Sequence, residues 1–447
     1  MFITSAFASY FMNCYHVVID SDMIRNIMQT DIKESCDLYN LKLVLYLLFL
    51  GILPSIFIYK VKIVSEPFKV SMKKRVKLLL LSLLSIIILL LSFSKFYTSF
   101  FREHKPLRYY TNPTYWIYAI GDYVAKTLDS GKVVVKPIGL DAKIANTTQA
   151  PKLVIMVVGE ATRADHLSLN GYKRETNPLL KQEQVINLTH VSSCGTSTAH
   201  SVPCMFSIYD REAYSYKKAI RTENVLDVLK HTNKVAILWR DNNSNSKGVA
   251  LRVPYEDYKN PKTNTICDNE CRDEGMLVGL KEFIEQHSKE DILIVLHQKG
   301  NHGPAYYKRY TKDFEKFKPV CQTNQLESCT QEEINNAYDN ALLHTDYFLS
   351  EVIGLLKSYD NSHQTAMLYM SDHGESLGEN GIYLHGMPYF MAPEAQTHIA
   401  ALAWFGKNNP KTIDPNKAYS QDNLFHTLLG LFNVETKVYN PKMDMVQ

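Results

Sequence analysis

Two long apolar stretches near the start of the chain most restrict what it can fold into. They cover residues 41–59 (LKLVLYLLFLGILPSIFIY) and 78–93 (LLLLSLLSIIILLLSF), and each is about long enough to cross a bilayer as a helix. The loop between them carries Lys and Arg residues against the single acid Glu66, so the positive-inside rule makes it cytoplasmic. A buried core helix, or a signal peptide for the first stretch, fits this hairpin less well, because no small-residue cleavage site stands out.

These stretches divide the chain into three parts. Residues 1–97 form an expected transmembrane region, whose first segment resembles the outer end of a further membrane helix, so the chain is expected to be truncated at its N-terminus. Residues 98–150 begin with aromatic and basic side chains typical of the headgroup zone and form an expected membrane-surface linker, with a plain amphipathic helix as the alternative. Residues 151–447 form an expected exported domain, and the 45% hydrophobic content is enough for a large core.

The exported domain alternates apolar runs with helical patterns. Short apolar runs typical of buried strands lie at 153–158, 235–239, 292–296, 366–370 and 399–405. Helical patterns lie at 223–230 and 332–357, and the second has an apolar stripe with a period of 3.6 residues. This alternation predicts an α/β fold, with a mainly parallel sheet covered by helices on both faces.

Several of these strands end on polar, titratable residues. Glu160 follows the first run, and Asp372 and His373 follow the run at 366–370. Ligands of open α/β sheets bind at the carboxyl ends of the strands. Carboxylate oxygen and imidazole nitrogen are zinc ligands, so these ends are a candidate metal site, although an Asp-His pair alone is common on surfaces.

A second candidate centre is the segment between Cys194 and Cys204, which holds Thr198 near the start of an expected helix. Amides at a helix N-terminus favour an anion, either an alkoxide or a phosphate. A zinc ion would activate the Thr198 hydroxyl by lowering its pKa, as it does for bound water. An N-cap role is the alternative for Thr198, and Thr196 or Ser197 competes for the role of nucleophile.

Cysteine usage also suggests an exported domain. Six of the eight cysteines follow the second apolar stretch, and they lie as near neighbours in the sequence. Six cysteines allow 15 pairings, but short separations in an oxidising compartment favour local disulfides. A zinc cluster at Cys267 and Cys271 is the minor alternative. Cys14 and Cys36 have no evident partner.

Several motifs together closely resemble the phosphoethanolamine transferases that act on lipid A, with the mobile colistin-resistance enzymes as the nearest members. They are 158–160 (VGE), 163–172 (RADHLSLNGY), 194–204, 301–304 (NHGP), 337–342 (AYDNAL) and 371–385 (SDHGESLGENGIYLH). The resemblance implies an alkaline-phosphatase-like α/β domain preceded by transmembrane helices. It departs in one respect, because that family has five membrane helices and this chain shows two complete ones.

Carried over by position, the resemblance implies roles for individual residues. The implied zinc ligands are Glu160, Thr198, Asp372 and His373, with Thr198 as the nucleophile that becomes phosphorylated. The residues implied to hold the donor phosphate or a second zinc, and to assist proton transfer, are His302 and His385. The residues implied to contact the phosphoethanolamine group are Asn243 and Lys247. The implied disulfides join Cys194 to Cys204, Cys267 to Cys271 and Cys321 to Cys329.

The expected activity is transfer of phosphoethanolamine from phosphatidylethanolamine to lipid A through a phosphothreonine, which would confer resistance to cationic peptides such as colistin. The expected location is the bacterial inner membrane, as a multi-pass protein with its catalytic domain in the periplasm, and no nucleic-acid partner is expected. Alternatives are a phosphoglycerol transferase, a zinc-dependent phosphatase or sulfatase-like hydrolase, or a non-catalytic membrane-anchored binding protein. Residues 201–205 (SVPCM) lack the arginine of a sulfatase motif.

Overall fold

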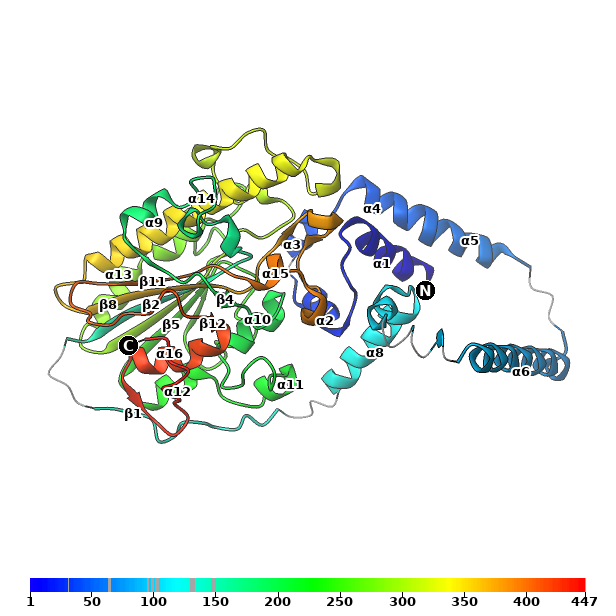
Figure 1. The fold of residues 1–447 in the computed structure, drawn as a ribbon, viewed down its shortest axis with the longest axis horizontal. Coiled ribbons are helices and arrows are strands. Elements are labelled where there is room, and N and C mark those ends of the chain that lie inside the picture. Colours follow the sequence, from blue (N-terminus) through cyan, green and yellow to red (C-terminus); the bar gives the residue numbers. More distant parts are fainter. Residues whose placement is uncertain are drawn as a thin grey trace.

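A seven-stranded sheet forms the centre of the domain that follows the apolar N-terminal helices (Figure 1). In the computed structural model, residues 1–30, 32–62, 66–94, 96–97, 100, 104–128, 133–145 and 150–446 are described. The strand order is β3-β11-β8-β2-β7-β5-β6. The parallel strands are β2 (Lys152–Gly159), β5 (Val235–Asp241), β6 (Tyr255–Asp257), β7 (Asp291–His297) and β8 (Gln364–Ser371). The antiparallel edge consists of β3 (Ile186–Asn187) and β11 (Ala401–Phe405).

The central strand β2 is buried along its whole length, so its alternating side chains enter two separate cores. Val154 and Met156 belong to the core under α10 (Thr198–Met205), α12 (Val225–His231) and α16 (Leu424–Leu431). Leu153 and Ile155 belong to the core under α9 (Pro178–Gln182), α13 (Leu280–Gln286) and α14 (Gln331–Lys357). Figure 1 shows these two groups of helices on opposite sides of the sheet.

The expected strands and helices of this domain are confirmed, with one difference in direction. β11 runs antiparallel to β8, with Ala401 beside Met370. The carboxyl end of β11 therefore lies beside the amino ends of the parallel strands, and not beside their carboxyl ends. The helix expected at 332–357 begins at Gln331, where Thr330 and Glu333 form a capping box. Shorter pairings join β1 (Lys143–Ile144) to β13 (Val434–Glu435), β4 (Val191–Ser192) to β12 (Tyr419–Ser420) and β9 (Ser376–Leu377) to β10 (Tyr383–Leu384).

The N-terminal region is helical. Its elements are α1 (Phe2–Cys14), α2 (Ser21–Gln29), α3 (Ile32–Asp37), α4 (Leu41–Tyr46), the π-helical η1 (Leu47–Ile52), α5 (Leu53–Lys60) and α6 (Phe68–Ser92). Among the described residues, two helices, Leu41–Lys60 and Phe68–Ser92, are long and apolar enough to cross a membrane. The second begins well before residue 78, so most of the expected basic loop is helix. Lys and Arg favour helices, and their long side chains reach the membrane surface from a helix end.

The expected linker contains η2 (Lys105–Tyr110) and α8 (Thr114–Leu128), while residues 98–99, 101–103, 129–132 and 146–149 lie outside the described part. α8 packs against α2. It leaves apolar side chains exposed, including Ile117, Tyr118 and Val124. Its position on the membrane surface remains a prediction.

Candidate functional site

The first part of the site lies where β2 and β8 end side by side. The two strands are parallel and Gly159 pairs with Ser371, so Glu160 and Asp372 leave the sheet at the same edge. His373 Nε2 lies 3.3 Å from Glu160 Oε1 and 3.3 Å from Asp372 Oδ2. All three side chains are fully buried. The structure therefore brings together three of the four residues expected to bind a metal.

The fourth, Thr198, reaches the same point from α10. Its Oγ1 donates to Glu160 Oε2 at 3.1 Å and lies 3.3 Å from His373 Nε2. Ser197 holds the N-cap position of α10, so the N-cap alternative for Thr198 is wrong. Thr196, a competing nucleophile, donates its hydroxyl to the Met387 carbonyl at 2.6 Å instead. Thr198 is thus the hydroxyl that faces the two carboxylates.

The donor atoms of this cluster fit a cation. His373 Nδ1 donates to the Gly374 carbonyl at 2.8 Å, which leaves Nε2 as the ligand atom. Glu160 Oε1 and Asp372 Oδ2 are buried and accept no hydrogen bond from any described residue. Ligand atoms of Glu160, Asp372 and His373 all lie within 4.8 Å of one another. Buried carboxylate oxygens facing an imidazole lone pair need a positive charge between them.

The pKa shifts of these groups also reflect two buried carboxylates that lie beside one imidazole. Burial favours the neutral form of Glu160, but His373, with His302 and His385, holds its pKa well below the usual range. Burial and the charge of Glu160 raise the pKa of Asp372. Burial opposes the charged form of His373, yet Asp372 and Glu160 raise its pKa to about 10. A proton or a metal ion at Nε2 therefore stabilises this site.

Two further histidines border the cluster. The His385 ring centroid lies 4.1 Å from that of His373 and 5.8 Å from that of His302. His385 Nδ1 and Glu375 Oε2 are 2.7 Å apart. Ligand atoms of His373, Glu375 and His385 form a second group within 4.8 Å. The structure thus places both expected phosphate-site histidines beside the carboxylate cluster.

The two residues expected to contact the transferred group lie in different surroundings. Asn243 Nδ2 donates to Glu160 Oε2 at 2.8 Å and to the Gln298 carbonyl at 2.7 Å, so Asn243 orients a carboxylate of the cluster. Lys247 Nζ lies 3.5 Å from the Gln29 carbonyl at the end of α2. Substrate contact by either residue remains a prediction.

Comparisons with known proteins identify the family. Family profiles match residues 152–434 ("Sulfatase") and residues 1–128 ("Phosphoethanolamine transferase EptA/EptB"). The chain is 44% identical to phosphatidylethanolamine transferase Mcr-1 of Escherichia coli over 447 residues, which cover 97% of this chain and 82% of Mcr-1. It is 40% identical to phosphoethanolamine transferase EptA of Escherichia coli K12 over 460 residues, which cover 100% of this chain and 84% of EptA. This chain belongs to the phosphoethanolamine transferase family.

A solved relative matches the whole chain in three dimensions. The integral membrane protein EptA of Neisseria meningitidis superposes on the transferase with a TM-score of 0.94 at 35% identity, and the match covers 100% of this chain and 85% of that structure. The alkaline-phosphatase-like α/β fold preceded by apolar helices, expected from the sequence, is therefore confirmed.

Glu375 has a role at the site that was not predicted from the sequence. Its buried carboxylate accepts from Tyr306 Oη at 2.7 Å and pairs with His385 Nδ1, so it orients one of the two histidines expected at the phosphate site. Its position two residues after His373 was the available signal. Gln421 was also missed: its Nε2 donates to the Ser371 and Asp372 carbonyls at 2.8 Å each and so supports the end of β8. Nothing in its local sequence indicated this role.

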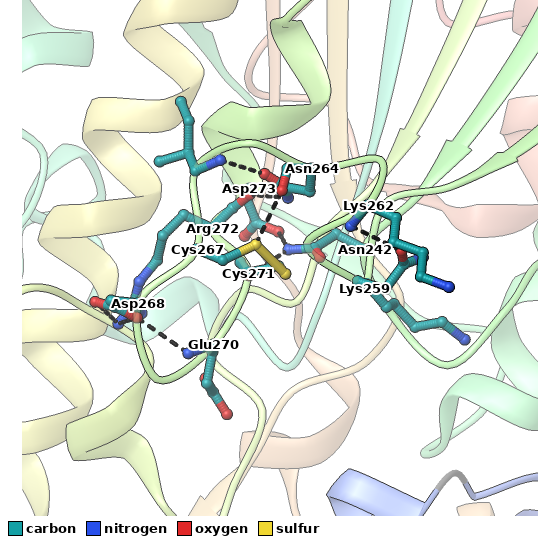
Figure 2. Close-up of a disulfide and its surroundings, with 12 residues drawn as sticks. Asn242, Lys259, Lys262, Asn264, Cys267, Asp268, Glu270, Cys271, Arg272 and Asp273 are labelled. Atoms are coloured by element: carbon teal, nitrogen blue, oxygen red, sulfur yellow. Dashed lines mark hydrogen bonds and ion pairs between the residues drawn. A yellow bond between two sulfur atoms is a disulfide. The ribbon is translucent and has the colours of Figure 1, made fainter.

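Three disulfides, all between near neighbours, support the loops of the transferase. Cys194–Cys204 encloses the start of α10, and Cys321–Cys329 closes a loop before α14. Figure 2 shows the third, Cys267–Cys271, and this bond excludes a zinc cluster at these two sulfurs. Cys14 and Cys36 are free thiols.

The Cys267–Cys271 loop leads directly to Asp273, a residue that the sequence did not single out. Its carboxylate accepts from the backbone amides of Lys299 and Gly300, at 2.8 and 3.0 Å. It also accepts from Asn242 Nδ2 at 2.8 Å, and Figure 2 labels both of these residues. Asp273, two residues after the disulfide, therefore holds the segment that leads from β7 to His302.

Proposed function

We propose that this chain transfers phosphoethanolamine from phosphatidylethanolamine to a phosphate of lipid A, with a phosphothreonine at Thr198 as the intermediate. The observation that carries the proposal is the Thr198 hydroxyl, which lies 3.1 Å from Glu160 and 3.3 Å from His373 at the start of α10. The family membership and the activities named for Mcr-1 and EptA support the same conclusion.

Zinc is the proposed cofactor, held by Glu160, Asp372, His373 and the Thr198 oxygen, a set of oxygen and nitrogen donors that suits this ion. When bound, zinc lowers the pKa of a coordinated hydroxyl and so makes it a nucleophile near neutral pH. Asn243 contributes by fixing Glu160 Oε2 through its amide.

The proposed reaction is a double displacement. Thr198 Oγ1 gives its proton to Glu160 Oε2, to which it donates a hydrogen bond, and forms a bond to phosphorus while the bond from phosphorus to the diacylglycerol oxygen breaks. His302 and His385 border the site and supply the proton that the departing oxygen takes up. A phosphate oxygen of lipid A then forms a bond to the phosphorus while the bond from phosphorus to Thr198 Oγ1 breaks, and Oγ1 takes its proton back from Glu160. A covalent intermediate suits two bulky lipids that bind in turn.

The proposed location is the inner membrane, with residues 1–97 as the membrane region, residues 98–150 as the surface linker and residues 151–447 as the periplasmic catalytic domain. Two helices suitable for spanning a bilayer and three disulfides in the domain after them support this arrangement. An added ethanolamine cation reduces the negative charge of lipid A and so weakens the attraction of cationic peptides such as colistin.

Mass spectrometry of lipid A from cells that express the chain tests the proposal. The wild type is expected to add phosphoethanolamine, Thr198→Ala to add none, and Thr196→Ala, in the same loop, to retain transfer. Release of free phosphoethanolamine without modified lipid A would instead indicate a hydrolase. Transfer by Thr198→Ala would reject Thr198 as the nucleophile.

A further inference from the structure

A buried arginine joins the active-site region to the segment that precedes the first membrane helix. The Arg309 side chain is 1% exposed. Its Nε donates to the His302 carbonyl at 2.6 Å, and its Nη2 lies 2.8 Å from Asp37 Oδ2. Its Nη1 pairs with Glu270. One guanidinium therefore holds three groups from three separate parts of the chain.

The three partners have different origins. Asp37 ends α3, just before the first membrane-spanning helix. Glu270 lies within the Cys267–Cys271 loop and appears beside the disulfide in Figure 2. His302 borders the carboxylate cluster through its contact with His385. Arg309 thus lies between the membrane region, the disulfide loop and the expected phosphate site.

Neighbouring contacts hold this junction together. Lys308 Nζ donates to Asp37 Oδ1 at 2.6 Å, and Asn324 Nδ2 donates to the Asp37 carbonyl at 2.6 Å. Arg272, on the other side of the disulfide, donates to the Lys308 carbonyl at 2.7 Å. The 308–309 backbone is therefore held from the disulfide loop and from α3 together.

The charges at this junction depend on one another. Burial favours the neutral forms of Asp37 and Glu270, but Arg309 offsets this effect and lowers the pKa of both carboxyl groups. A guanidinium presents its donors in a fixed planar fork, which lysine does not reproduce. Loss of one carboxylate would leave part of a buried positive charge unpaired. We expect the guanidinium then to turn toward the carboxylate that remains and to shift the His302 carbonyl, to which its Nε donates.

We propose that Arg309 is a positioning residue for His302, and that docking of Asp37 from the membrane-proximal segment completes its geometry. The inference rests on the proposed function, since it assigns His302 a part in phosphoryl transfer. It implies that the catalytic domain reaches full activity only when α3 packs against it. Only molecules that are correctly assembled at the membrane would then transfer phosphoethanolamine at the full rate.

The test uses the full-length chain in detergent micelles with a fluorescent phosphatidylethanolamine. Asp37→Asn preserves the shape of the side chain and removes its charge. The matched control is Glu327→Gln, which breaks a second ion pair between the same two regions, from Lys42 Nζ to Glu327 Oε1 at 2.8 Å. A displacement of about 1 Å in a positioning group can cost about 100-fold in rate, so a partial shift is expected to lower kcat about tenfold in Asp37→Asn, with KM and bound zinc retained.

A double-mutant cycle with His302→Ala separates positioning from general damage. In the His302→Ala background, Asp37→Asn is expected to lower kcat less than about twofold, because the residue that it positions is already absent. An undiminished loss in that background overturns the proposal. An equal loss in Glu327→Gln also overturns it, because docking in general would then explain the effect.

A second measurement does not depend on activity. Hydrogen exchange of the backbone amides of residues 299–303 and 305 is expected to be faster in Asp37→Asn than in the wild type and unchanged in Glu327→Gln. Unchanged exchange in Asp37→Asn overturns the positioning role. If the wild type transfers nothing while the exchange difference is present, the proposed function fails and the coupling between Asp37 and the His302 loop stands.

Discussion

Replacement of Asn243 by alanine tests whether the buried carboxylate cluster is a metal site. Asn243 Nδ2 donates to Glu160 Oε2 at 2.8 Å, and Asn243 is only 2% exposed, so water does not replace the lost donor. A hydrogen bond to a charged group contributes about 1.5–3 kcal/mol. Each 1.4 kcal/mol of binding free energy changes a dissociation constant by a factor of ten. Asn243→Ala is therefore expected to raise the dissociation constant of zinc about 10- to 100-fold.

The assay is a zinc titration of the purified full-length chain against a chelating dye of known affinity. Asn336→Ala is the matched control, because Asn336 is also 2% exposed and its Nδ2 donates to the Pro319 carbonyl at 2.7 Å. The control is expected to lower the melting temperature without a change in zinc affinity. Equal zinc affinity in Asn243→Ala and the wild type would refute the reasoning, and so would an equal loss in both variants.

Three further changes have defined outcomes. Glu375→Gln is expected to lower kcat about tenfold with zinc content unchanged, because His385 loses its charged partner at 2.7 Å; an unaltered kcat in the lipid assay contradicts this. Burial raises the pKa of Asp346 from 3.8 to about 7, so the folded state favours the protonated carboxyl group. The contribution of Asp346 to the free energy of unfolding is therefore complete below pH 4 and is lost as the pH rises to 7, by at most roughly 1.4 kcal/mol per pH unit. Melting curves of Asp346→Asn should lack that slope, and an unchanged slope would show that other groups cause it. Replacement of both Cys194 and Cys204 by alanine is expected to cost about 3 kcal/mol in the free energy of unfolding, since the bond closes a ten-residue separation; denaturant unfolding that shows no loss rejects this.

Local sequence patterns were sufficient to predict most of the domain. The apolar runs that became β2, β5, β7 and β8 are short and bounded by polar residues, so their local sequence was enough to predict strands there. The start of the second membrane helix was placed too late, because hydropathy marks where a helix is apolar and does not show where helical backbone begins. The direction of β11 was also undetermined, because pairing direction depends on the connection in space.

The sequence by itself determined which residue types stand at the strand ends, and with them the carboxylates and the imidazole of the site. Only the tertiary structure decided which side chains support them: Asn243 reaches Glu160 across 83 residues of sequence, and Arg309 reaches Asp37 across 272. Strand order and the seating of α3 against the domain create these contacts. A hydrogen bond requires only that its donor and acceptor lie close together in the folded protein. The number of residues between them in the sequence therefore does not reveal the contact.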